Sequence, residues 1–207
     1  RQYKFVLMSS SSSPVTAASL GYQGPELQGQ YRLPAGQQCM KFTQVAAEGG
    51  VLPAPLIRDS FELWPAKRKE MVVDFTKYMD GTPTRKGDVV YLVNVAKMTN
   101  GRMQDGPDPR YQVPVLKFVI GDDAPDNSLI PKAMREQPPI PNLTGLPRRT
   151  FRLDRGGGFG GETEWIINGL PFDPSIALAN PVQGSAEVWT VQNGGGGWTH
   201  PMHLHME

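Results

Sequence analysis

Glycine and proline interrupt this chain so often that an architecture of long helices is excluded. The sequence contains 23 glycines and 20 prolines among 207 residues, and both residue types weaken helices while favouring turns. Hydrophobic residues make up 39% of the chain, which is enough for an apolar core and excludes wholesale disorder. The sequence therefore predicts an all-β fold of short strands joined by turns.

Segments rich in β-branched and aromatic residues alternate with turn signals over the first 121 residues. The turn signals include Glu48-Gly49-Gly50 and Lys86-Gly87-Asp88. Val51–Pro55 carries two prolines, which lack the N–H that a central strand must donate, so this segment cannot be a central strand. The pattern is typical of a β-sandwich or small barrel, with strands expected at Tyr3–Met8, Met40–Ala46, Phe61–Trp64, Met71–Phe75, Val89–Val95 and Val115–Ile120.

A proline-rich stretch precedes a second β-rich region. Six prolines lie between residues 122 and 147, and such segments are stiff and extended, as interdomain linkers are. Within it, Ser128–Glu136 is a candidate for one short helix capped by Ser128. Strands resume at Thr150–Leu153, Glu164–Ile167 and Ala186–Gln192.

The second β-rich region is short for a complete domain. Residues 148–207 number about 60, whereas a sandwich domain typically needs ~100 residues. The sequence thus predicts one domain at 1–121, a linker at 122–147, and the N-terminal part of a second domain at 148–207. We expect the chain to be a fragment of a longer protein.

All three histidines of the chain, His200, His203 and His205, lie among its last eight residues. On an extended segment His203 and His205 point the same way, whereas His200 faces the opposite side. Neutral imidazole is a common nitrogen ligand for copper, zinc and iron, so the cluster predicts metal binding. The alternative, core histidines satisfied by carbonyl groups, leaves their confinement to six positions unexplained.

Two features near this cluster and upstream of it allow more than one interpretation. Trp198 is either an aromatic wall beside the metal or a space-filling residue. Gly156, Gly158 and Gly161 match G-x-G-x-x-G, but a strand follows them where a dinucleotide site needs a helix. We therefore interpret Arg155–Gly161 as a flexible loop.

Cys39 and Asn142 are the remaining candidates for chemistry. Cys39 is the only cysteine, which excludes an internal disulfide framework and a multi-cysteine zinc site within the chain. We expect it to be buried as a small apolar side chain. Asn142-Leu143-Thr144 fits the N-glycosylation pattern and favours secretion.

Net charge and hydropathy exclude two classes of partner. The formal net charge is +1, so general electrostatic attraction to nucleic acid is not expected. No apolar run approaches the ~20 residues of a membrane-spanning helix.

The segment Trp198–His205 resembles the H-P-x-H-x-H copper motif of the multicopper oxidases, in the branch of bilirubin oxidases and laccases. The strand before it, Ala186–Asn193, is similar to the strand that leads into that motif. Glu164–Phe172 is similar to the W-x-I-N-G stretch of the third cupredoxin domain, and Glu48–Pro55 and Val72–Phe75 resemble parts of the second.

This resemblance implies cupredoxin-like Greek-key β-sandwich domains and four coppers in the complete enzyme. His200 would bind the type 1 copper, His203 the type 2 copper and His205 one copper of the type 3 pair. The type 1 thiolate and the other histidine ligands would come from the remaining domains of the same enzyme, because Cys39 does not match the family's copper-binding cysteine.

The function implied is a secreted oxidase. It would take electrons from phenolic, aromatic amine or tetrapyrrole substrates at type 1 copper, next to Trp198. It would use them to reduce O2 to water at a trinuclear cluster.

Two alternatives remain open. Gly197, His203 and His205 also fit the G-x5-H-x-H pattern of cupin-type metal-dependent oxygenases, although Glu207 comes too early for the glutamate that pattern needs. The other alternative is a non-catalytic metal-binding β module.

Overall fold

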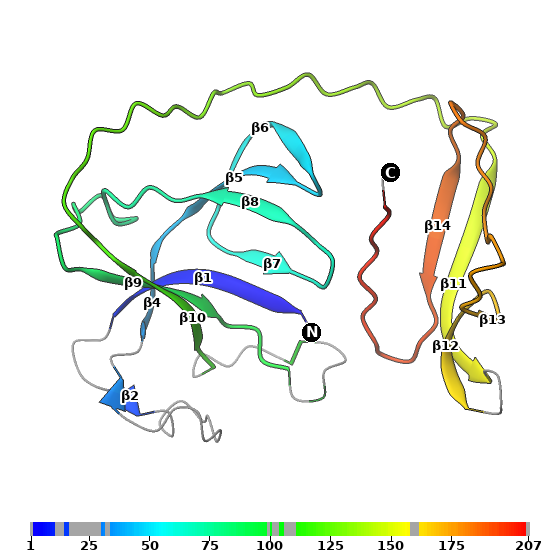
Figure 1. The fold of residues 1–207 in the computed structure, drawn as a ribbon, viewed down its shortest axis with the longest axis horizontal. Helices are drawn as coiled ribbons and strands as arrows, with labels where there is room; N and C mark the ends of the chain where they lie inside the picture. Colours follow the sequence, from blue (N-terminus) through cyan, green and yellow to red (C-terminus); the bar gives the residue numbers. More distant parts are fainter. Residues whose placement is uncertain are drawn as a thin grey trace. The chain divides into compact units, whose positions relative to one another are not determined.

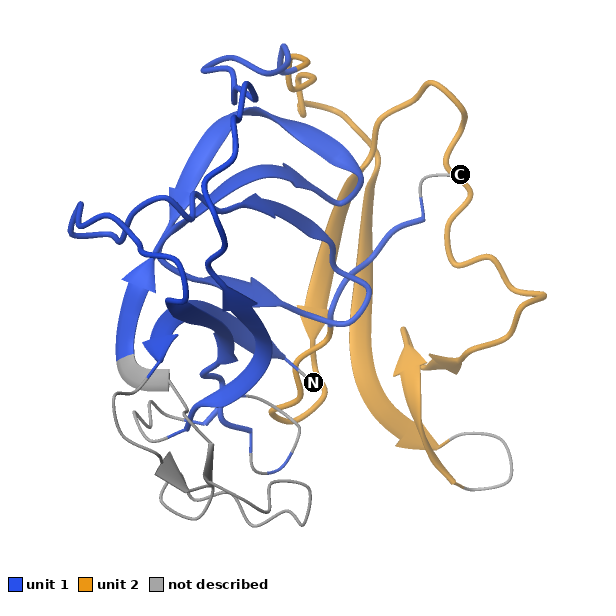
Figure 2. Ribbon diagram, turned by 60° about the vertical axis from the view of Figure 1, so that its left-hand side comes forward, with its two compact units in different colours: residues 1–137, 201–207 blue, residues 138–200 orange. Residues whose placement is uncertain are grey.

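The computed structural model describes residues 2–10, 15–16, 30–31, 34–98, 100, 104–105, 111–157 and 162–205. Every regular element in these ranges is a strand, as the sequence predicts. Two compact units are present, unit 1 with residues 1–137 and 201–207 and unit 2 with residues 138–200 (Figure 2). The three-part domain division stays a prediction. None of the described residues forms a helix capable of spanning a membrane.

The described part of unit 1 contains two larger antiparallel sheets and one separate pair of strands (Figure 1). The larger has the order β10-β9-β1-β4, and β7 also pairs with β1. The smaller has the order β6-β5-β8, and β2 pairs with β3 separately. The bounds are β1 Tyr3–Ser10, β2 Val15–Thr16, β3 Gln30–Tyr31, β4 Pro34–Met40, β5 Phe42–Ala47, β6 Gly50–Arg58, β7 Phe61–Leu63, β8 Lys69–Val72, β9 Val89–Asn94 and β10 Val113–Val119.

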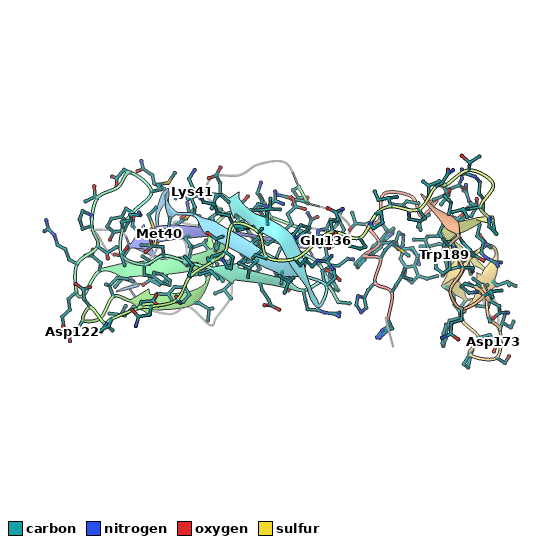
Figure 3. The ribbon with its side chains drawn as sticks, turned by 90° about the horizontal axis from the view of Figure 1, so that it is seen from above. Met40, Lys41, Asp122, Glu136, Asp173 and Trp189 are labelled. Carbon is teal, nitrogen blue, oxygen red and sulfur yellow. The ribbon has the colours of Figure 1, made fainter. Side chains whose placement is uncertain are left out.

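The core of unit 1 follows from the alternation of side chains along β1. Leu7 points into a cluster that joins both sheets, because its members come from β4, β5 and β9 as well. Its neighbours Val6 and Met8 point the other way, into a second cluster with Val93. Both faces of β1 are therefore buried over Phe5–Met8, which explains the unbroken apolar run of these four residues. At the end of β4, Met40 is buried while the next residue, Lys41, reaches the surface (Figure 3).

The proline-containing segment at residues 51–55 is part of β6, which lies at the end of the strand order β6-β5-β8 and is an edge strand among the described residues. This position confirms that the segment is not a central strand. The carbonyl of Pro53 accepts a hydrogen bond from the backbone N–H of Met134 (2.9 Å), so the proline-rich stretch lies against this edge within unit 1.

The candidate helix at Ser128–Glu136 is wrong, because these residues contain no helical turn. Ile130 precedes Pro131, and the steric clash with the proline ring disfavours the α region for the residue before it. The backbone N–H of Ser128 donates instead to the carboxylate of Asp126 (2.8 Å), which makes a local turn rather than a helix cap.

Unit 2 contains one four-stranded sheet with the order β13-β12-β11-β14. The pairs β11–β12 and β12–β13 are antiparallel, whereas β11–β14 is parallel. Asn168 (φ 53°) and Gly169 (φ 81°) form the two-residue turn between β12 and β13, which the Asn-Gly pair favours. The bounds are β11 Arg148–Gly157, β12 Thr163–Ile167, β13 Leu170–Pro171 and β14 Val188–Asn193.

The glycine-rich loop expected at Arg155–Gly161 begins later than predicted. Arg155, Gly156 and Gly157 belong to β11 and pair with β12, whereas Gly158–Gly161 lie outside the described residues. A Cβ at Gly156 would come 2.5 Å from Cδ1 of Ile166. Glycine is therefore used here for close packing of a side chain from the neighbouring strand.

Candidate metal centre

The glycine run after β14 brings Trp198 and His200 next to Trp165 on β12. The N–H of Gly194 donates to the carbonyl of Leu153 in β11 (2.7 Å). The side chain of Asn193 accepts from the N–H of Gly195 (3.1 Å) and donates to the carbonyl of Trp198 (2.7 Å). Hydrogen bonds therefore hold the turn at its start and at its end. The turn places Trp198 and His200 beside the sheet of unit 2.

One aromatic ring, that of Trp165, contacts His200 directly. The indole of Trp165, on β12, contacts the imidazole edge to face, with centroids 4.9 Å apart and planes at 83°. Trp165 contacts Trp198 in the same manner, at 5.3 Å and 82°. The guanidinium of Arg155 lies 5.1 Å from the ring centroid of Trp165 and 6.0 Å from that of Trp198. These are cation–π distances.

The position of Gly195 beside His200 requires a residue without a side chain. A Cβ at this position would lie 3.0 Å from Nε2 of His200 and 3.2 Å from Cζ3 of Trp165. Such contacts are closer than an ordinary van der Waals approach. Gly195 and Trp165 thus bound the imidazole from the protein side. The sequence analysis missed both roles, although the four consecutive glycines before the motif were a visible signal.

The buried Nε2 atom of His200 has no hydrogen-bond partner in the described part of the chain. An unpaired buried polar atom costs free energy, so most such atoms in proteins are satisfied. A ring nitrogen held in this way suits a ligand-binding imidazole. The chemistry of the donor and its surroundings therefore fit the copper ligand that the resemblance implies at His200.

A cavity of about 510 Å³ within unit 2 has His200 in its wall. Its lining is mostly apolar, with Asp154 and Asp173 as the acidic members. The apolar lining residues are Leu153, Trp165, Ile166, Ile167, Leu170, Pro171, Phe172, Ile176 and Leu178. Low polarity around a metal ligand limits the access of water and affects the properties of a bound ion.

His203 and His205 lie in unit 1, with ring centroids 4.8 Å apart and planes at 71°. This proximity agrees with the expectation that the two side chains point the same way. His203 is largely buried, with 13% of its side chain exposed, and its Nδ1 lies 3.5 Å from the Glu48 carboxylate. The Nη1 atom of Arg68 lies 2.9 Å from Nε2 of the His203 ring.

The carboxylate of Glu48 has a pKa below its usual value. Desolvation raises this pKa, but hydrogen bonds from the Arg68 backbone and from His203, together with the charges of Lys67 and Arg68, outweigh that effect. The sequence analysis missed the approach of Glu48 and Arg68 to His203, because more than 130 residues separate them from the histidine along the chain.

No group of three or more histidine, cysteine, aspartate or glutamate side chains that could hold a metal occurs in the described ranges. The assignments of His200, His203 and His205 to type 1, type 2 and type 3 copper stay predictions.

The other candidate residues have simpler environments. Cys39 is a buried free thiol in the core of unit 1, as expected, and burial raises its pKa to about 11. Asn142 is exposed, and its side-chain oxygen accepts from the N–H of Thr144 (3.0 Å). Trp198 is half-buried. A substrate-side role for Trp198 and glycosylation at Asn142 stay predictions.

Comparison with known proteins relates the chain to copper enzymes. No protein-family profile matches it. It is 33% identical over 173 residues to bilirubin oxidase of Albifimbria verrucaria. This match covers 81% of the chain and 27% of the bilirubin oxidase. It is 26% identical over 167 residues to a laccase of Bacillus subtilis strain 168, covering 80% of this chain and 30% of the laccase. A solved multicopper oxidase of Campylobacter jejuni matches with a TM-score of 0.57 at 15% identity, over 94% of this chain and 35% of that chain.

The chain spans less than a third of the length of these curated relatives. The match to the solved oxidase confirms the all-β, cupredoxin-like fold. The sequence similarity, which covers about four fifths of the chain, relates it to part of a bilirubin oxidase and of a laccase, and the structural match relates its fold to that of a multicopper oxidase.

Proposed function

We propose that the protein carrying this chain is a copper-dependent oxidase that takes single electrons from a small reducing substrate and delivers them to O2. The observation that carries the proposal is the buried Nε2 of His200, which has no hydrogen-bond partner among the residues that the structure describes. It lies in an H-P-x-H-x-H segment that holds every histidine of the chain. Similarity to bilirubin oxidase and to laccase supports it.

In this function His200 holds a type 1 copper, His203 the type 2 copper and His205 one copper of the type 3 pair. When bound, copper supplies the one-electron redox chemistry and the activation of O2. The contact between the His203 and His205 rings suits ligands of neighbouring ions. A cysteine thiolate and the other ligands are supplied by further domains of the same protein.

The substrate class we propose is phenols, aromatic amines or tetrapyrroles, and the names of the relatives support it. Such molecules lose one electron readily because the resulting radical is delocalised. Trp198, which is half-buried two residues before His200, is the side chain proposed to line the substrate site. Replacing it should change the preference among donors more than the rate of O2 reduction.

The first test is the visible absorption spectrum of the purified full-length protein, with copper counted per molecule. We expect a strong band near ~600 nm from thiolate–copper ligation and about four coppers. His200→Gln should remove the band, whereas His203→Gln should keep the band and abolish O2 consumption with a phenolic donor. Met202→Leu, which changes an exposed side chain between them, is the control and should keep both.

A colourless protein with one metal or none would contradict the proposed oxidase. A variant pattern in which His200→Gln and His203→Gln had identical effects on the band would contradict the division of roles.

Secretion is part of the same proposal and is supported by the exposed Asn142 in its Asn-Leu-Thr sequence. Endoglycosidase treatment of protein from the native source should increase its electrophoretic mobility, and Asn142→Gln should remove that change. Mobility that is unaffected by the enzyme would contradict glycosylation at this site.

A further inference from the structure

Trp165, in unit 2, contacts the rings of both Trp198 and His200. Its ring lies 4.9 Å from His200 and 5.3 Å from Trp198, edge to face in both cases. Unlike those two residues, it belongs to a regular strand, β12. It is therefore the ring whose position the sheet determines, and the other two pack against it.

The register of the sheet also holds a cation over Trp165. Arg155 on β11 is the direct cross-strand partner of Trp165, and its guanidinium lies 5.1 Å from the ring centroid. Directly opposed side chains on antiparallel strands stabilise each other, and a cation over an indole adds electrostatic attraction. The indole is thus restrained by Arg155 on the neighbouring strand as well as by the rings of Trp198 and His200.

The orientation of the His200 ring depends on packing. Its buried Nε2 has no hydrogen-bond partner in the part of the molecule that the structure describes. The groups closest to that nitrogen include the backbone of Gly195, where an added Cβ would lie 3.0 Å away, and the same Cβ would lie 3.2 Å from Trp165. The imidazole is therefore bounded by the glycine and the indole together.

We propose that Trp165 is a positioning residue for His200. Its indole, restrained by Arg155 and Trp198, sets the plane of the imidazole and excludes water from Nε2. Removing the indole lets the ring rotate and admits water, which favours the more highly charged oxidised state of a bound metal ion and lowers its reduction potential. Only this last consequence rests on the proposed copper function.

The first arm of the test needs no metal. Ring resonances of His200 are recorded by NMR on the histidine-labelled, metal-free full-length protein and assigned with His200→Gln. We expect Trp165→Leu to move and broaden them, because the aromatic neighbour is lost. Trp165→Phe, which keeps an aromatic ring, should restore much of the original position.

Trp189 provides a matched control on the same sheet. It is exposed to a similar extent, 37% against 45% for Trp165, and its edge-to-face contact is with Phe151 (4.9 Å). Trp189→Leu should destabilise the sheet to a similar degree but leave the His200 resonances in place. If Trp165→Leu fails to fold, the comparison between Trp165→Phe and Trp189→Phe replaces it.

The second arm uses the same variants loaded with copper. Trp165→Leu should shift the visible band and lower the reduction potential, whereas Trp189→Leu should change neither. His200 resonances that stay unchanged in Trp165→Leu would overturn the proposal, even if the wild-type band is present. A wild-type protein without the band would overturn the oxidase function, while the first arm would still decide the role of Trp165.

Discussion

Among single residues, Gly195 shows how a glycine can be required by space rather than by backbone conformation. An added Cβ would meet Nε2 of His200 at 3.0 Å and Trp165 at 3.2 Å, so the neighbours would have to move. A Cβ added to Gly157, in β11, would have no atom within 4 Å. The two glycines therefore allow the same substitution to be compared at a crowded site and at an open one.

We expect Gly195→Ala to lower the free energy of unfolding by about 1–3 kcal/mol, the usual cost of overpacking, and to displace the His200 resonances. Gly157→Ala should leave those resonances in place and stabilise the strand by roughly 0.5–1 kcal/mol, because glycine is unfavourable in strand interiors. Urea denaturation followed by fluorescence measures the free energy of unfolding of both variants, and NMR records their His200 resonances. Equal effects of the two substitutions would contradict the packing described at Gly195.

At the scale of elements, the parallel pair β11–β14 is joined by a charged contact at its start. The guanidinium of Arg149 donates twice to the carboxylate of Glu187, at 2.6 and 2.9 Å. The indole N–H of Trp189 donates to the same carboxylate (2.8 Å). The hydrogen bonds from Arg149 and then from Trp189 lower the pKa of Glu187 to about 2, because they stabilise its ionised form.

This lowered pKa predicts the sign of a pH effect. A carboxylate with a depressed pKa in the folded state contributes stability above its unfolded pKa of 4.5, and that contribution is lost as the pH falls towards about 2. Glu187→Gln should therefore reduce the urea midpoint at neutral pH. The difference from wild type should shrink as the pH falls below 4.5.

The control for this experiment is Glu164→Gln, since Glu164 is in the same sheet on β12. Its substitution should leave the urea midpoint at neutral pH close to that of wild type. A Glu187→Gln difference that stayed constant down to the lowest pH at which the fold persists would contradict the role assigned to the Arg149 contact.

At the scale of the whole molecule, the described parts of the two units differ in how many apolar side chains they bury. Unit 1 has two clusters of buried side chains. In unit 2 the buried hydrophobic residues of the described part are Phe151 and Leu153, while Phe172 is 88% and Val182 73% exposed. Large exposed apolar areas commonly mark surfaces that are covered by other parts of a protein or by partners.

We therefore expect a polypeptide of these 207 residues, produced by itself, to bind an apolar fluorescent dye. Replacing Phe172 and Val182 together by serine should reduce dye fluorescence by more than half. Replacing the exposed Ile57 (65%) on edge strand β6 of unit 1 should have little effect. Dye binding that depended equally on Ile57 would contradict the assignment of this surface to unit 2.

Local sequence determined the features that depend on neighbouring residues. Turn chemistry at Glu48-Gly49 and Asn168-Gly169 produced hairpins at both places, and the prolines near residue 53 placed β6 at a sheet edge. The missed helix at Ser128–Glu136 was also a local matter, since Pro131 follows Ile130 and outweighs the capping signal of Ser128.

The sequence by itself also determined where the candidate metal ligands are concentrated, because all three histidines lie together in one short segment. Only the tertiary structure decided what surrounds them. Trp165 reaches His200, and Arg68 reaches His203, from strands or turns far away along the chain. These contacts depend on strand register and on the path of the glycine turn after β14, and such pairings are set by packing over the whole unit rather than by residues adjacent in sequence.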